Sequence, residues 1–294
     1  MADFGMDEIK KLRESTGAGV MDCKEALNEV EGDVEAAIDY LREKGMAEAA
    51  RRDKVAAEGL VEVEVDEDRA SGLICEVNSE TDFVARNDEF IELAEDIAAR
   101  LKSSSAESVE EFTEEDWDGE MTVDEKIREV AASMGENIRV RRFERFQTDG
   151  FLVGYLHQGG QIGTIVELDG EEDEEVAKNV AMHIAASAPR YISREDVAQE
   201  DIEREKKVYR EQMINEGKPE DIIDNIVEGK IDKFFTQICL LEQEYVRDPD
   251  ISVGEYLDEH DMDVINFVRY EVGEGIETED EDFAEEVKEQ VEKS

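Results

Sequence analysis

The fold is decided by the stretch Gly59-Leu60-Val61-Glu62-Val63-Glu64-Val65 and by a second apolar run, Gly72 to Val77, that follows it. Apolar and acidic side chains alternate in the first run, which is typical of a half-buried strand. The polar stretch Asp66-Glu67-Asp68 separates the two runs. Two strand-like runs joined by a short polar connection predict a β-hairpin.

The same pattern returns in the second half of the chain. Phe151 to Leu156 and Ile162 to Leu168 are strand-like runs on either side of the turn His157-Gln158-Gly159-Gly160. An internal repeat of this kind indicates two copies of one structural unit.

Each predicted hairpin is followed by a helix and a further strand. Apolar residues recur at helical spacing from Phe90 to Leu101 and from Val176 to Ala188. Strand-like runs follow near residues 136–141 and 265–270. The fold class is therefore predicted to be α+β, with two related subdomains built on antiparallel strands.

Other elements flank or interrupt the repeat. Three short helical patterns in residues 6–45 predict a small three-helix module. Glu195 to Asn215 and Pro219 to Leu240 predict two long helices that form a projecting helical hairpin. The acidic, Ser-rich segment from Ser103 to Gly119 predicts a mobile loop, and the apolar spacing after Thr278 predicts a final amphipathic helix.

These patterns predict the division of the chain into parts. The expected parts are a helical module 1–45, a tether 46–58, a core subdomain N 59–143, a core subdomain C 144–277 that includes the helical hairpin 195–240, and a C-terminal helix 278–294.

The charge restricts the class of partner. The chain has 33 Lys and Arg against 82 Asp and Glu, a formal net charge of −49. Because contacts to phosphate groups need cations, we expect neither a nucleic acid nor a membrane as partner. The acids are dispersed between apolar residues, which favours a solvated acidic surface over a nucleic-acid mimic. Our hypothesis is halophilic adaptation, that is, a high-salt cytoplasm.

Other features fit a cytoplasmic location. The sequence has no long apolar run, and its amino terminus lacks the pattern of a signal peptide. Cys23, Cys75 and Cys239 are odd in number and far apart, as in a reducing compartment without disulfides.

The usual signatures of an active site are missing from the sequence. None of His157, His183 and His260 has neighbours at metal-ligand spacing. Glycine-rich stretches also fail as phosphate loops, since Gly217-Lys218-Pro219 lacks the final hydroxyl residue. We therefore expect no enzyme, no cofactor and no metal site, and a packed or hydrogen-bonded role for His183.

The most informative connection is Thr81 to Asn87, which joins a strand to a helix. It places Phe83 and Val84 between Asp82 and Arg86, although such connections are usually polar. Phe83 either packs under the connection and fixes the next helix, or stands exposed as an aromatic residue of an interface. The pattern leaves both interpretations open.

Several stretches carry a resemblance to a known family. They are residues 11–24, residues 181–186, residues 269–276 and the stretch Glu76-Val77-Asn78-Ser79-Glu80-Thr81-Asp82-Phe83-Val84-Ala85-Arg86-Asn87. In these motifs, and in their order, the sequence resembles the translation elongation factor Ts family, the guanine-nucleotide exchange factors of elongation factor Tu. The resemblance implies an N-terminal ubiquitin-associated-like module, two related core subdomains and a projecting helical hairpin.

The resemblance also implies functional residues. Thr81, Asp82, Phe83 and Val84 match the segment that dislodges the magnesium ion of the partner GTPase, and Phe83 matches the residue that enters near its nucleotide site. Gln161 departs from the basic residue that the family often has there. Further implied partner contacts are Leu12, Val20, Met21, Met134 and His157.

Two functions are compatible with the sequence. The first is nucleotide exchange on elongation factor Tu. The second is an acidic binding adaptor that uses the ubiquitin-associated-like module without exchange activity. Release of GDP from the GTPase distinguishes the two.

The net charge of −49 generates a prediction about salt. Raising KCl from low millimolar toward molar concentration should raise the melting temperature, because the Debye length falls to about 3 Å at 1 M and screens the repulsion between carboxylates. A midpoint that stays constant over this range would contradict the high-salt hypothesis.

Overall fold

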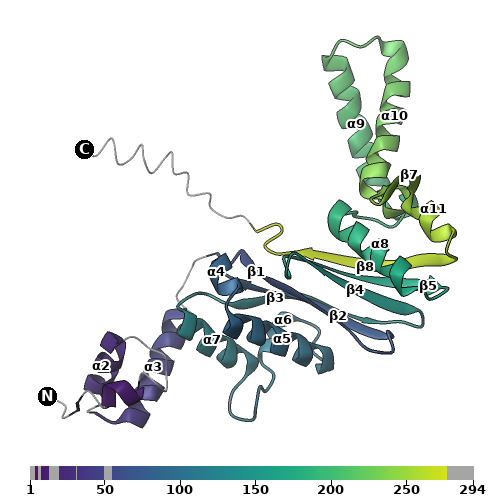
Figure 1. The fold of residues 1–294 in the computed structure, drawn as a ribbon. Coiled ribbons are helices and arrows are strands. Elements are labelled where there is room, and N and C mark those ends of the chain that lie inside the picture. Colours follow the sequence, from purple (N-terminus) through teal and green to yellow (C-terminus); the bar gives the residue numbers. More distant parts are fainter. Residues whose placement is uncertain (1–3, 6–7, 13–19, 31, 50–54, 277–294) are drawn as a thin grey trace, which may run out of the picture. The chain divides into compact units, whose positions relative to one another are not determined.

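The computed structural model describes residues 4–5, 8–12, 20–30, 32–49 and 55–276 (Figure 1). The predicted C-terminal helix 278–294 and the middle of the tether, residues 50–54, lie outside the described residues. So do the side chains of residues 20–22 and 42–49. Helices and antiparallel strands are both present, and the predicted α+β class is confirmed.

The N-terminal part is helical, as predicted. Residues 8–12 are helical and precede α2 (Val20–Glu29) and α3 (Val34–Ala49). Asp33 caps α3, since its Oδ1 accepts hydrogen bonds from the backbone N–H of Glu35 at 2.9 Å and of Ala36 at 3.2 Å. The small core contains Leu12, Cys23, Ala26, Leu27 and Ala37.

The first sheet has the strand order β1 (Glu58–Val65), β2 (Ser71–Ser79), β3 (Arg139–Gln147). Between β2 and β3 the chain forms α4 (Asp82–Ala85), α5 (Asp88–Ser103), α6 (Val109–Thr113) and α7 (Val123–Met134). Of the residues predicted for the apolar face of α5, Ile91 is only half-buried, whereas the others are buried: Phe90, Ala94, Ile97, Ala98 and Leu101. Leu93 completes the buried face.

The segment 103–119 differs from the mobile loop that its composition predicted. It contains α6, whose Phe112 is fully buried, and it buries Trp117 as well. The guanidinium of Arg100 lies 3.8 Å from the centre of the Trp117 ring. The burial of two aromatic side chains therefore fixes this segment, although its many acidic residues and serines predicted a mobile loop.

The second sheet has the order β4 (Phe151–His157), β5 (Ile162–Gly170), β8 (Met262–Glu271), and α8 (Glu174–Ser187) packs on β4 and β5. β4 and β5 are antiparallel, with Phe151 opposite Leu168 and His157 opposite Ile162. In both sheets the last strand pairs with the second strand of the hairpin. The shared topology confirms the repeat predicted from the sequence.

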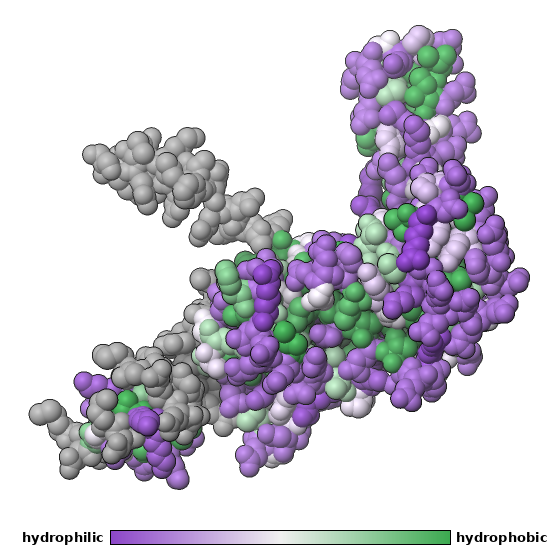
Figure 2. Space-filling view, in the orientation of Figure 1, coloured by the Kyte–Doolittle hydropathy of each residue, from purple (hydrophilic) through white to green (hydrophobic). Residues whose placement is uncertain are grey.

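The predicted helical hairpin is formed by α9 (Gln199–Asn215) and α10 (Glu220–Ile238) (Figure 1). Apolar residues of both helices, among them Met213, Ile223, Val227 and Ile231, pack together. Figure 2 shows apolar surface near the free end of this hairpin, where Ile214 and Ile222 are exposed. The chain returns through β6 (Glu244–Tyr245), β7 (Asp248–Ser252) and α11 (Val253–Asp258) to β8.

Contacts divide the chain into two compact units. The described residues of 1–62, 75–143 and 271–276 form one unit, and residues 63–74 and 144–270 form the other. Residues 63–74 are the tip of the β1–β2 hairpin, where the Arg69 carbonyl accepts a 2.8 Å hydrogen bond from the Leu152 backbone N–H. The absence of a side chain at Gly72 makes room for Ile165, because a Cβ atom at position 72 would lie only 2.7 Å from Cδ1 of Ile165.

His183 has the hydrogen-bonded role that the sequence predicted. It is fully buried in α8, and its Nδ1 accepts a 3.2 Å hydrogen bond from the Val246 backbone N–H. Nε2 therefore carries the proton and donates to Oε1 of Gln243 at 2.9 Å. Burial lowers the pKa of His183, which keeps the ring neutral.

Candidate functional site

The Thr81–Val84 connection forms a short helical turn with Phe83 on its outside. Thr81 is the N-cap of α4, and its Oγ1 accepts a 3.4 Å hydrogen bond from the Val84 backbone N–H. Ala85 faces inward and is buried. Phe83 is 81% exposed. The interpretation that Phe83 packs under the connection is therefore wrong. The ring is exposed, and its role in an interface stays a prediction.

Glu136 holds the turn from behind. Its Oε1 accepts a 2.7 Å hydrogen bond from the Thr81 hydroxyl, and its Oε2 accepts a 3.1 Å bond from the Thr81 backbone N–H. A further hydrogen bond joins the same two stretches with donor and acceptor exchanged: the Asn137 backbone N–H donates to Oε1 of Glu80 at 2.7 Å. These bonds fix the turn to the chain that follows α7 without any contribution from the Phe83 ring.

Two charged residues flank Phe83. Asp82 Oδ2 lies 3.0 Å from Nη2 of Arg86, one helical turn away, and both side chains are largely exposed. An exposed pair of this kind contributes little to stability. Asn87 ends the connection by capping α5, where its Oδ1 accepts a 2.9 Å bond from the Glu89 N–H.

The other predicted contact residues lie in different places. Met134 is half-buried at the end of α7, two positions before Glu136, so it belongs to the neighbourhood of the Phe83 turn. His157 is half-buried at the end of β4, and its Nδ1 lies 3.0 Å from the hydroxyl of Tyr155. Leu12 is fully buried in the core of the helical module. Val20 and Met21 lie in α2, and their side chains are outside the description.

Sequence reasoning missed the residues that support the turn. Glu76, Asn78 and Ser79 are fully buried on β2, although a buried strand position usually holds an apolar side chain. A polar run inside a predicted strand was the available signal, because buried polar groups need partners. The other partners of Glu76, namely Arg141, Arg142 and Gly273, come from distant parts of the chain, which no local pattern reveals.

Two kinds of feature are not found among the described residues. Among them, no group of three or more His, Cys, Asp or Glu is arranged to hold a metal ion. Within the same part of the chain, each helix is either too short or too polar to cross a membrane.

Comparison with known proteins finds similarity over most of the chain. The family model described as Elongation factor TS matches residues 80–274, which include the Phe83 turn. A curated relative, Elongation factor Ts of Halothermothrix orenii, is 53% identical over 296 aligned residues, covering 99% of this chain and 99% of the relative.

The exposure of Phe83 generates a prediction about stability. Phe83→Ala should change the free energy of unfolding by less than about 0.5 kcal/mol, because the ring buries little surface. Phe90→Ala, on the buried face of α5, should lower it by about 3–5 kcal/mol. Urea unfolding at fixed salt, followed by the fluorescence of the single tryptophan, Trp117, measures both. A loss for Phe83→Ala as large as that for Phe90→Ala would show that the ring is packed.

Proposed function

Since the chain belongs to the elongation factor Ts family, we propose that it binds GDP-bound elongation factor Tu, dislodges the magnesium ion of that GTPase and promotes release of GDP and reloading with GTP. The observation that carries the proposal is the 81% exposure of Phe83 on a turn that other residues hold in place. An aromatic side chain in this setting can enter a partner without any loss of packing in its own protein.

Exchange by this route is a matter of differential binding. The factor must bind the nucleotide-free GTPase more tightly than the GDP-bound form, and by linkage it lowers the affinity of the GTPase for GDP by the same factor. Acceleration of release by about ten-thousand-fold needs a difference of about 5.5 kcal/mol. The factor makes and breaks no covalent bond in this process, so it is not an enzyme in the catalytic sense and needs no cofactor of its own.

Phe83 supplies only part of that difference. Burial of one phenylalanine contributes roughly 1.5–3 kcal/mol. The remainder has to come from a wider surface, for which Met134, near the Phe83 turn, and His157 are the described candidates. Leu12 is buried in the free chain, so its contribution would be to hold the shape of the helical module that carries Val20 and Met21.

The proposed setting is protein biosynthesis in the cytoplasm. The net charge of −49 favours a protein partner over a nucleic acid or an anionic membrane. The alternative function is the adaptor without exchange activity, which needs only a docking surface. The exposed ring between two charged residues would suit docking as well. What favours exchange is the resemblance of Thr81 to Val84 to the family segment that dislodges the magnesium ion.

The experiment follows the release of fluorescent GDP from the cognate GTPase in the presence of the full chain. The wild-type chain should accelerate release, and Phe83→Ala should slow the accelerated rate by up to about a hundredfold if the lost burial appears fully in the barrier. Asp82→Ala should have a smaller effect in the same direction. Val246→Ala, which also truncates an exposed apolar residue, serves as the matched control and should leave the rate unchanged.

Two results would contradict the proposal. A wild-type chain that binds the GTPase but leaves the GDP release rate unchanged would support the adaptor. A Phe83→Ala variant with full exchange activity would remove Phe83 from the mechanism.

A further inference from the structure

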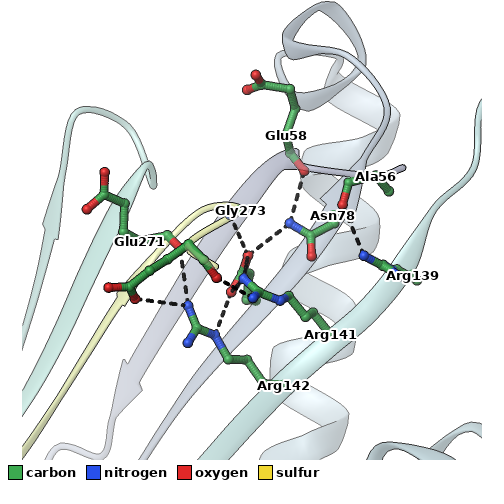
Figure 3. Close-up of polar contacts among 10 residues, drawn as sticks. Ala56, Glu58, Asn78, Arg139, Arg141, Arg142, Glu271 and Gly273 are labelled. Atoms are coloured by element: carbon green, nitrogen blue, oxygen red, sulfur yellow. Dashed lines mark hydrogen bonds and ion pairs between the residues drawn. The ribbon is translucent and has the colours of Figure 1, made fainter. Parts of the chain in front are cut away.

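A buried carboxylate lies on the strand that leads to the Phe83 turn. Glu76 is fully buried on β2, and its two oxygens accept hydrogen bonds from three side chains and one backbone group. Figure 3 labels these donors, which are Asn78, Arg141, Arg142 and Gly273. The distances to Oε1 are 2.9 Å from Asn78 Nδ2, 2.9 Å from Arg141 Nη1 and 2.8 Å from the Gly273 backbone N–H. Oε2 lies 2.6 Å from Nε of Arg142. Burial opposes the charge, but these donors outweigh it and lower the pKa of Glu76.

The two arginines also hold the segment 271–276, which begins at the last residue of β8. Nη2 of Arg141 donates to the carbonyl oxygen of Glu274, and Nη2 of Arg142 donates to that of Glu271 at 3.2 Å. In Figure 3 Arg142 lies beside Glu271, on the side of the cluster away from Asn78. The guanidinium fork suits this task, because one arginine can bond a carboxylate and a carbonyl oxygen at once.

The segment 271–276 also packs closely on the chain that precedes β1. Gly273 has a φ of +73°, and a Cβ atom there would lie 2.2 Å from the carbonyl oxygen of Ala57. Asn78, which donates to Glu76, donates to the Glu58 carbonyl oxygen at 3.1 Å as well. The carboxylate of Glu76 is therefore the shared centre of β2, β3, the start of β1 and the segment 271–276.

The same strand continues into the functional turn. After Glu76 and Asn78, the Ser79 hydroxyl donates to the Thr81 carbonyl oxygen at 3.0 Å, and Thr81 caps α4. The backbone between the buried carboxylate and Phe83 is thus hydrogen-bonded through side chains at several successive positions. A shift of β2 at Glu76 would be passed directly to the turn.

We propose that Glu76 is a positioning residue that couples the segment 271–276 to the Phe83 turn. The buried carboxylate holds both in one arrangement, so loosening the segment loosens the turn, although the two are far apart in the sequence. The effect on nucleotide release rests on the proposed function, whereas the coupling itself does not.

The test compares three full-length variants with the wild type. Glu76→Gln replaces one carboxylate oxygen with an NH2 group that faces other donors. Arg142→Lys keeps a positive charge near Glu76 but cannot bond both Glu76 and the Glu271 carbonyl oxygen as arginine does. Glu242→Gln is the matched control, because it removes a carboxylate–arginine pair with Arg194 in the other unit, where the Glu242 Oε2 to Arg194 Nη2 distance is 2.6 Å.

Hydrogen exchange of backbone amides gives the first readout. Glu76→Gln should speed exchange in both 271–276 and 79–86 by about tenfold or more, as expected for the loss of charge-assisted hydrogen bonds. Arg142→Lys should speed exchange in both segments by a smaller factor, and Glu242→Gln in neither. If the Glu76→Gln variant does not fold, the exchange rates of the Arg142→Lys variant test the coupling. Faster exchange in 271–276 with wild-type exchange in 79–86 overturns the coupling.

Release of fluorescent GDP gives the second readout. A misplaced turn should lower the maximal rate of GDP release at saturating factor more than it raises the half-saturating concentration of the factor. Simple destabilisation would instead lower the amount of folded protein and leave the maximal rate per folded molecule unchanged. Faster hydrogen exchange in 79–86 with an unchanged maximal rate would overturn the positioning role. If the wild type itself fails to accelerate GDP release, the proposed function is wrong. The hydrogen-exchange result then still tests the coupling between segments 271–276 and 79–86.

Discussion

A phenylalanine that stays in water on a short turn depends on hydrogen bonds that hold the turn without it. In most connections such a ring would pack inward and supply the stability itself. Here Glu136 holds the backbone and hydroxyl of Thr81, and Ala85 fills the inner side of α4. The apolar surface of Phe83 therefore remains exposed while Glu136 and Thr81 hold the turn.

Buried charge and surface charge play different parts in this chain. Most of the acids can be dispersed over a solvated surface, where salt screens them. Glu76 is the opposite case, a carboxylate without access to water that is neutralised by Arg141 and Arg142. A buried ion pair adds little net stability compared with apolar packing, but removing one partner leaves a charge unpaired at a cost of about 3–5 kcal/mol. Such a group enforces one arrangement of the strands around it.

The sequence predicted what local patterns encode and missed what distant contacts decide. The repeat of hairpin, helix and strand, the helical hairpin and the buried face of α5 all followed from residue spacing. The exposure of Phe83 did not, because it depends on Glu136, which lies 55 positions from Thr81. The structure of residues 103–119 depends on the burial of Phe112 and Trp117. Glu76 accepts a hydrogen bond from Gly273, which lies 197 positions away in the sequence. Spacing alone cannot bring such residues together.

The proposed function requires that the chain bind the nucleotide-free GTPase better than the GDP-bound form. The most direct measurement is the dissociation constant of the full chain for both forms of elongation factor Tu, with and without magnesium and GDP, at one salt concentration. We expect much tighter binding to the nucleotide-free form, by the same factor by which the chain weakens GDP binding. Equal dissociation constants for the two forms would contradict it, however tightly the chain binds.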